Sequence, residues 1–244
     1  KDEDSEEEFA RLVGRKPPKV KKNKKNGEGG DGGAGGAGGE GGEGEDEEAA
    51  LAVLRRGAMS GTDVTRQFEE ELCAYFNLPY ALCHNTGTAA IQAAMWACGV
   101  RRGDEAICQS MTYWGSALQV FSLGATVVFG EMDPSTLTLD PADVESRITD
   151  RTKAIIVVHY SAYPTDMDPI MEIAERRGIK VIEDVSHAQG GLYKGRLLGT
   201  IGHVGAMSIM SGKSLPCGEG GFLVTEDREI YERSVSFGHY QRSF

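Results

Sequence analysis

The chain has 244 residues, of which 40% are hydrophobic, enough to bury one substantial core and part of a second. Its formal net charge of −11 argues against nucleic acid or an acidic membrane as the main partner, because both bind basic surfaces. The five cysteines and five histidines are scattered without the spacing of a zinc site or a disulfide framework, so we expect no metal and a reducing, cytoplasmic location.

Residues 1–50 differ in composition from the rest of the chain. An acidic run (2–8) is followed by a basic run (16–25) and a tract rich in glycine and acid (27–48). Because this tract has almost no apolar surface to bury, we expect a disordered charged arm. The basic run is a candidate nuclear-import or RNA-contact patch, but we favour a solvated charge block neutralised by its acidic neighbours.

From residue 51 to 244 the composition is that of a globular domain, in which helices are expected at 48–56 and 63–76 before a regular alternation begins. The expected strands are residues 80–84, 105–109, 125–131, 153–159, 179–183, 204–210 and 222–225. The expected helices are residues 87–98, 113–122, 140–148, 168–178 and 227–235. This alternation predicts an α/β fold with a mostly parallel central sheet and helices on both faces.

In such sheets, ligands bind at the carboxyl ends of the strands, and two segments there are candidates. Asn85–Ala90 joins a strand to a helix, where backbone N–H groups and threonine hydroxyls can form an anion site, although an ordinary capped helix start explains the segment equally well. Asp184 ends another strand. No helix start lies beside it to be capped, so we favour contact with a positive group of a ligand.

The third candidate is Lys213, in a loop of small residues between two apolar runs and five residues after Ser208. A desolvated lysine loses its proton readily and can hold a carbonyl cofactor as a Schiff base. Taken alone, Lys213 is better explained as a surface lysine whose stem covers apolar neighbours. Together, the amine of Lys213, the carboxylate of Asp184 and the anion site at Asn85–Ala90 match the groups of pyridoxal 5′-phosphate. Tyr113, at another strand-to-helix junction, is placed to stack on its ring.

On these residues the chain resembles the DegT/DnrJ/EryC1/StrS family of sugar aminotransferases, fold-type I enzymes related to aspartate aminotransferase. The matching segments are Asn85–Ala90, Asp140–Pro141, His159–Asp168, Val181–Asp184, Tyr193–Gly195, and Lys213 with Gly218–Gly221. The resemblance begins near Leu51. It implies that residues 51–244 are the large domain that binds pyridoxal phosphate, and that the small C-terminal domain is missing.

The resemblance also implies a role for each candidate. Lys213 would form the Schiff base and later move a proton between carbons, while Asp184 would keep the pyridine nitrogen protonated. The implied cofactor-binding residues are Gly87, Thr88, Ala89 and Ser208 at the phosphate, Tyr113 on the ring, His187 near the ring hydroxyl, and Asp184 and Lys213 themselves. The implied reaction is ping-pong transamination from glutamine or glutamate to a keto sugar or keto-cyclitol, either a nucleotide-linked sugar or an inosose.

Some features depart from the family. His203 stands where the family usually has an acid, and Pro216 and Cys217 stand where it often has threonine or other small residues. Lys213 argues against the related dehydratases, which carry histidine at that position. We expect a homodimer in the full-length form, and weak cofactor binding with little turnover by this chain alone. The alternatives are a non-catalytic relative that binds cofactor or a partner protein, and an elimination or aldol-type cleavage on the same fold.

Overall fold

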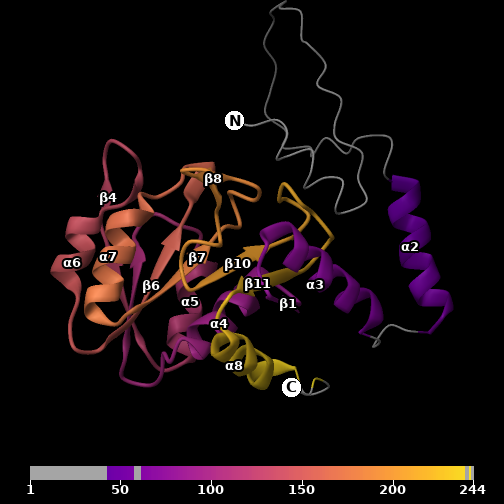
Figure 1. Cartoon of the computed structure of the whole chain (residues 1–244), viewed down its shortest axis with the longest axis horizontal. Coiled ribbons are helices and arrows are strands. Elements are labelled where there is room, and N and C mark those ends of the chain that lie inside the picture. Colours follow the sequence, from indigo (N-terminus) through magenta and orange to yellow (C-terminus); the bar gives the residue numbers. More distant parts are fainter. Residues whose placement is uncertain (1–42, 58–61, 240–241, 243–244) are drawn as a thin grey trace, which may run out of the picture. The chain divides into compact units, whose positions relative to one another are not determined.

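The computed structural model describes residues 43–57, 62–239 and 242, which belong to two compact units, residues 1–64 and 65–244 (Figure 1). In the first unit, helix α2 (Glu43–Arg55) begins at Glu43 rather than at Glu48 as expected, so residues 43–50 of the expected arm are helical. The remainder of that arm, including the basic run, lies outside the described residues.

A seven-stranded sheet forms the centre of the second unit, with strand order β1-β11-β10-β7-β6-β2-β3. These strands are β1 (Tyr80–His84), β2 (Glu105–Gln109), β3 (Thr126–Gly130), β6 (Thr152–Val158), β7 (Lys180–Asp184), β10 (Val204–Ser208) and β11 (Gly221–Thr225). In this sheet β11 runs antiparallel to β1 and β10, and the other pairs are parallel. The predicted, mostly parallel sheet is therefore confirmed.

Helices cover both faces of this sheet, as expected. They are α3 (Asp63–Phe76), α4 (Gly87–Ala97), α5 (Gly115–Ser122), α6 (Pro141–Arg147), α7 (Met167–Arg177) and α8 (Arg228–Gly238). The residues of α4, α5 and α8 share one core with Ile156, Ile182 and Leu223 of the sheet. Ile155 and Val181, at alternate strand positions, are fully buried on the opposite face, where α7 packs on β7 and against α6. Figure 1 shows these two helix groups, α4 with α8 and α6 with α7.

Some elements differ from expectation. The hairpins of β4 (Met132–Asp133) with β5 (Thr138–Leu139) and of β8 (Leu192–Tyr193) with β9 (Arg196–Leu197), and the 3₁₀ turn η1 (Tyr160–Ala162), were not expected. Asp166 rather than Asp168 is the N-cap of α7, and α5 begins at Gly115 rather than Tyr113. Two boundaries shape the functional edge: β7 includes Asp184 as its last residue, and β10 ends at Ser208 instead of Met210.

Candidate functional site

The candidate residues stand along one edge of the sheet. Because β1, β7, β10 and β2 are mutually parallel, their carboxyl ends meet at that edge. Asp184 is the last residue of β7 and Ser208 the last residue of β10, the neighbouring strand. The turn to Gly87 follows β1, and Tyr113 follows β2 before α5 begins.

The start of α4 lies directly against the end of β10. A Cβ atom added to Gly87 would lie 2.5 Å from Cβ of Ser208, so a side chain at Gly87 would push the two elements apart. The Oγ1 atom of Thr86 caps the helix by accepting the N–H of Ala89 at 3.0 Å. No described residue accepts the N–H groups of Gly87 and Thr88. The geometry thus offers Gly87 and Thr88, rather than Ala89, as amide donors to an anion.

Tyr113 and Thr88 lie beside the same glycine. A Cβ atom added to Gly115 would lie 2.8 Å from Cε1 of Tyr113 and 3.0 Å from Oγ1 of Thr88. The Tyr113 side chain is 53% exposed, so its ring has a free surface that a flat ligand can cover. The helix start that offers amide donors is therefore next to an aromatic ring.

Asp184 is held by hydrogen bonds from two serines. The residue is 4% exposed, and a carboxylate in that position is costly unless polar groups satisfy it. Its Oδ2 atom accepts the Ser116 hydroxyl at 2.7 Å, and its Oδ1 atom accepts the Ser186 N–H at 3.0 Å. The Thr112 hydroxyl lies 3.1 Å from that of Ser116 and extends the network. These bonds fix the direction of the carboxylate at the edge of the sheet.

Lys213, His187 and Asp184 act on one another electrostatically. Burial lowers the pKa of Lys213 below its usual value, and the negative charge of Asp184 partly offsets this. Burial also lowers the pKa of His187, as does the positive charge of Lys213, whereas Asp184 raises it. The edge thus brings together a half-buried amine, whose neutral fraction burial increases as a lysine nucleophile needs, and a buried acid that partly opposes this effect.

Three polar residues of this edge were missed by the sequence reasoning: Ser116, Ser186 and Gln189. The Ser186 hydroxyl accepts the N–H of Ser208 at 2.9 Å while its own N–H donates to Asp184, so it joins the ends of β7 and β10. Gln189 bonds to both Ser208 and Leu215. Ser186 and Gln189 closely follow Asp184, and their position next to an identified candidate was the available signal.

A second acid, Glu183, organises the loops behind the edge. It is fully buried, and its carboxylate accepts the N–H groups of Gly199, Ile201 and Gly202 at 2.9, 2.8 and 2.6 Å. Its Oε2 atom also lies 3.0 Å from Nε2 of the buried His159. Because Nδ1 of His159 accepts the Thr165 N–H, the proton sits on Nε2 and is donated to Glu183.

His203, which stands where the resemblance implies an acid, makes hydrogen bonds to strand β7 and to Thr225. Its Nδ1 atom accepts the N–H of Val181 at 3.0 Å, and its own N–H donates to the Val181 carbonyl at 2.9 Å. Its carbonyl accepts the Thr225 hydroxyl at 2.6 Å. The imidazole therefore links strand β7 to the turn before β10 as a hydrogen-bond acceptor.

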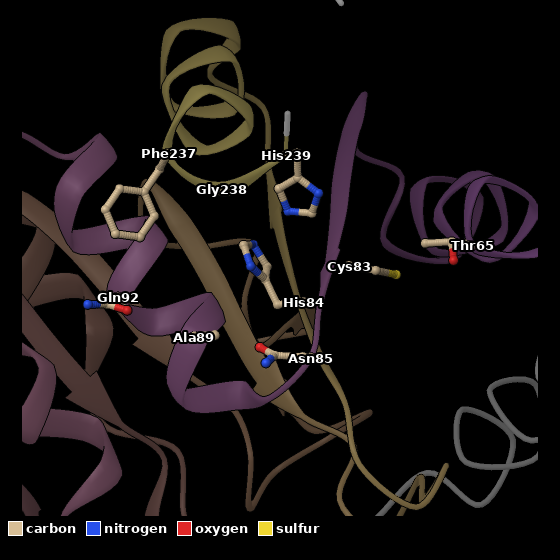
Figure 2. A pocket seen from close by; sticks show the side chains of 9 residues that line it. All are labelled: Thr65, Cys83, His84, Asn85, Ala89, Gln92, Phe237, Gly238 and His239. Carbon is tan, nitrogen blue, oxygen red and sulfur yellow. The ribbon is translucent and has the colours of Figure 1, made fainter. Parts of the chain in front are cut away.

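A cavity of about 490 Å³ adjoins the turn after β1 (Figure 2). It is lined by Thr65, Cys83, His84, Asn85, Ala89, Gln92, Phe237, Gly238 and His239. The His84 and His239 rings lie 5.0 Å apart, and burial lowers the pKa of His84 to about 3, so its ring is neutral. Neither Lys213 nor Asp184 lines this cavity, and Ala89 is the one candidate cofactor-binding residue among those that do.

The residues at the edge fit pyridoxal phosphate. The Gly87 turn has the close approach and amide donors that a phosphate needs, Asp184 is a buried acid, and Lys213 is a half-buried amine. Within the described part of the chain, no group of three or more His, Cys, Asp or Glu residues could hold a metal ion. No described helix is long and apolar enough to span a membrane.

Comparisons with known proteins agree with this geometry. The sequence profile of the DegT/DnrJ/EryC1/StrS aminotransferase family matches residues 41–242. The chain is 41% identical to L-glutamine:scyllo-inosose aminotransferase of Streptomyces griseus, over 69% of this chain and 40% of the relative. It is 37% identical to GDP-perosamine synthase of Escherichia coli O157:H7, over 70% of this chain and 47% of the relative. The chain spans about half the length of the curated relatives it matches.

Solved structures show the same fold. The pyridoxal phosphate form of the putative sugar aminotransferase Spr1654 from Streptococcus pneumoniae superimposes with a TM-score of 0.74 at 26% identity. The match covers 78% of this chain and 54% of that one. The central sheet and its helix layers are thus those of an aminotransferase.

Proposed function

Because the chain belongs to the DegT/DnrJ/EryC1/StrS aminotransferase family, we propose that it forms the cofactor-binding part of an enzyme that uses pyridoxal phosphate to aminate a keto sugar or keto-cyclitol. The amino donor in this proposal is glutamine or glutamate. The observation that carries it is that the buried Asp184, the loop of the half-buried Lys213 and the Gly87 turn packed against Ser208 all follow strand ends at one edge of the sheet. In this proposal residues 51–244 are the large domain.

Each residue of the edge has a task in this proposal. When bound, pyridoxal phosphate supplies an electron sink for a carbon that loses its proton. Gly87 and Thr88 would bind the phosphate through their N–H groups, and Ser208 would bind it through its hydroxyl. Tyr113 covers one face of the ring and keeps water from it.

The charged residues divide the work of proton handling. Asp184 would supply the negative charge that stabilises a protonated ring nitrogen, and its serine partners keep the carboxylate oriented. The Nζ atom of Lys213, whose pKa burial lowers, would accept and return the proton that moves between substrate carbons. His187, whose pKa is affected by the charges of both Lys213 and Asp184, would lie near the ring hydroxyl of a bound cofactor.

The substrate class is supported by the relatives. One relative is named for L-glutamine, an amino donor, and scyllo-inosose, a keto-cyclitol. Another is named for GDP-perosamine, a nucleotide-linked amino sugar. An acceptor with several hydroxyl groups and one ketone is common to both. The same class is the one that the sequence resemblance implies.

The test is a half-reaction followed by transfer. The purified chain is loaded with pyridoxal phosphate and given L-glutamine or L-glutamate, and pyridoxamine phosphate is measured by chromatography. We expect more product than with Lys213→Ala, and consumption of that product when scyllo-inosose or a nucleotide-linked keto sugar is added. Product formation equal to that of Lys213→Ala would overturn the proposal.

A homodimer is part of the proposal. Trp114, Leu118 and Phe121 are 60%, 41% and 61% exposed, and their spacing places them on one side of the α5 region. Apolar side chains gathered in this way mark protein interfaces more often than solvent-facing surface. Light scattering of the full-length form should give the mass of a dimer, and Phe121→Lys should shift it toward a monomer.

We also propose a cytoplasmic location, because the cysteines suit a reducing compartment. None of the five forms a disulfide, and burial raises the pKa of both Cys98 and Cys108 to about 12, which keeps these thiols protonated and unreactive. Cell fractionation with an antibody to the chain tests this location, and recovery in an oxidising compartment would contradict it.

A further inference from the structure

The loop that carries Lys213 is closed at its base by backbone hydrogen bonds. It connects the antiparallel strands β10 and β11, whose last register pair is Ser208 with Gly221. Beyond this pair, the Ile209 N–H donates to the Gly220 carbonyl at 3.0 Å, and the Ser211 N–H donates to Gly218 at 2.9 Å. The Cys217 N–H also donates to the Ile209 carbonyl at 2.8 Å, and these bonds fix the base of the loop. Lys213 lies farther out, and its own N–H donates to the Met210 carbonyl within the loop at 2.9 Å.

The outer part of the loop is tied to a different segment through one side chain. Gln189 lies in the loop after β7, and its Oε1 atom accepts the N–H of the buried Leu215 at 2.9 Å. Its Nε2 atom donates to the Ser208 carbonyl at 2.7 Å. The Gln189 amide thus bridges two residues. One is Ser208, the proposed phosphate-binding residue at the end of β10, and the other is Leu215, two positions after Lys213.

We propose that Gln189 is a positioning residue that holds the Lys213 loop against the end of β10, so that the lysine amine stays at the proposed site before any cofactor arrives. This inference rests on the proposed function for the lysine. Its physical basis is that a loop tip fixed at one buried amide loses the freedom that would let Lys213 swing into water. A side chain of the same length that lacks both the amide oxygen and the amide NH₂ can replace neither bond.

The variant that isolates the amide is Gln189→Met, which preserves length and flexibility but removes both hydrogen bonds. The matched control is Gln92→Met, because Gln92 lies on α4 and bonds to the exposed Ser122, away from the lysine loop. Gln189→Glu keeps an oxygen that can accept the Leu215 N–H and loses the donor to Ser208, so it carries the test should the methionine variant not fold.

Two measurements use the cofactor-free chain. Deuterium exchange of the segment containing Leu215 should speed up about tenfold in Gln189→Met, since two hydrogen bonds are lost, and less in Gln189→Glu. In competitive acylation of lysines, the pH midpoint for Lys213 should rise relative to the exposed reference Lys153 in the same sample, because a released loop exposes the amine to water. The Gln92→Met control should match the unmodified chain in both.

A third measurement adds pyridoxal phosphate and traps its covalent lysine adduct with borohydride. The rate of trapping at Lys213 should fall about tenfold in Gln189→Met and stay unchanged in Gln92→Met. Unchanged exchange at Leu215 together with an unchanged midpoint for Lys213 would overturn the role of Gln189. Absence of any adduct in the unmodified chain would instead overturn the proposed function, and the two cofactor-free measurements would still decide the role of Gln189.

Discussion

The hydroxyl of Ser116 donates a 2.7 Å hydrogen bond to Oδ2 of Asp184, which lies 68 residues later in the sequence. The bond joins the first turn of α5 to the last residue of β7. It gives a buried carboxylate a fixed orientation, and it links the segment that bears Tyr113 to the acid proposed to face the ring nitrogen. The site is therefore built by contacts between distant segments as well as by the residues at the strand ends.

Ser116→Ala should weaken both folding and cofactor binding. The change leaves one oxygen of a 4% exposed carboxylate without its donor, and the expected loss is about 1–3 kcal/mol of unfolding free energy. Urea denaturation measures the stability, and an absorbance titration with pyridoxal phosphate measures the affinity. Ser122→Ala, an exposed serine on the same helix, should change stability by less than about 0.5 kcal/mol. Equal effects of the two variants would contradict the role given to Ser116.

Gly87→Ala should separate α4 from β10. The added methyl group would lie 2.5 Å from Cβ of Ser208, so the helix start must shift and its amide donors move with it. We expect a loss of about 1–3 kcal/mol of unfolding free energy and loss of the advantage that pyridoxal phosphate has over pyridoxal in binding. Gly238→Ala is the matched control, because its added methyl would meet no described atom within 4 Å. If Gly87→Ala binds pyridoxal phosphate with unchanged affinity, the helix start at Gly87 is not the phosphate-binding site.

The charge of Asp184 should be visible in the titration of Lys213. Burial lowers the pKa of the lysine and Asp184 raises it, so removing the negative charge should lower that pKa further. In the cofactor-free chain, Asp184→Asn should therefore move the pH midpoint for acylation of Lys213 to a lower pH. Asp150→Asn, which removes an exposed acid, should leave the midpoint in place. A midpoint that rises in Asp184→Asn would show that the two groups do not interact as described.

Glu183 should contribute stability that is lost in acid. Burial raises the pKa of this carboxyl, but hydrogen bonds from His159 and the N–H groups of Gly199 and Gly202 outweigh burial and leave it below its usual value. A carboxyl with a lower pKa in the folded state stabilises the fold above its unfolded pKa, and this stability disappears as the pH falls through the folded pKa.

The variant Glu183→Gln tests whether the Glu183 carboxylate contributes this pH-dependent stability. Its amide NH₂ would face N–H donors from Gly199 and His159, so we expect a loss of about 3–5 kcal/mol at neutral pH. Because the variant lacks the titrating group, the stability difference from the unmodified chain should shrink as the pH is lowered below 4.5, the usual pKa of glutamate. Denaturation at several pH values measures it, and a difference independent of pH would contradict the assignment.

Much of the fold could be predicted from the sequence because its main strands are short apolar runs bounded by turn residues. The limits of β1 and β2 agree with the predicted ranges to the residue. The hairpins β4–β5 and β8–β9 could not be predicted, since two-residue strands are too short to show a pattern of alternation. The earlier start of α2 was missed because its first turn contains glycine, a poor helix former, and acids that show no apolar periodicity.

The candidate site divides in the same way. Lys213, Asp184 and the Gly87 turn could be identified because each directly follows or interrupts an apolar strand. Ser116 could not, since only the pairing of distant segments gives this serine its partner. For Ser186 and Gln189 the available signal was their position just after Asp184, because their hydrogen bonds also depend on distant segments. The contact of Gly87 with Ser208 likewise depends on the sheet order, which brings β1 and β10 to opposite sides of β11.

The central claim is that Lys213 is the amine that binds pyridoxal phosphate covalently. The most direct test incubates the purified chain with the cofactor, reduces the complex with borohydride and maps the modified lysine by mass spectrometry. We predict modification at Lys213 in preference to exposed lysines such as Lys153, less modification when pyridoxal replaces pyridoxal phosphate, and no corresponding adduct in Lys213→Ala. Modification spread over the surface lysines, with Lys213 no more reactive than they are, would contradict the claim.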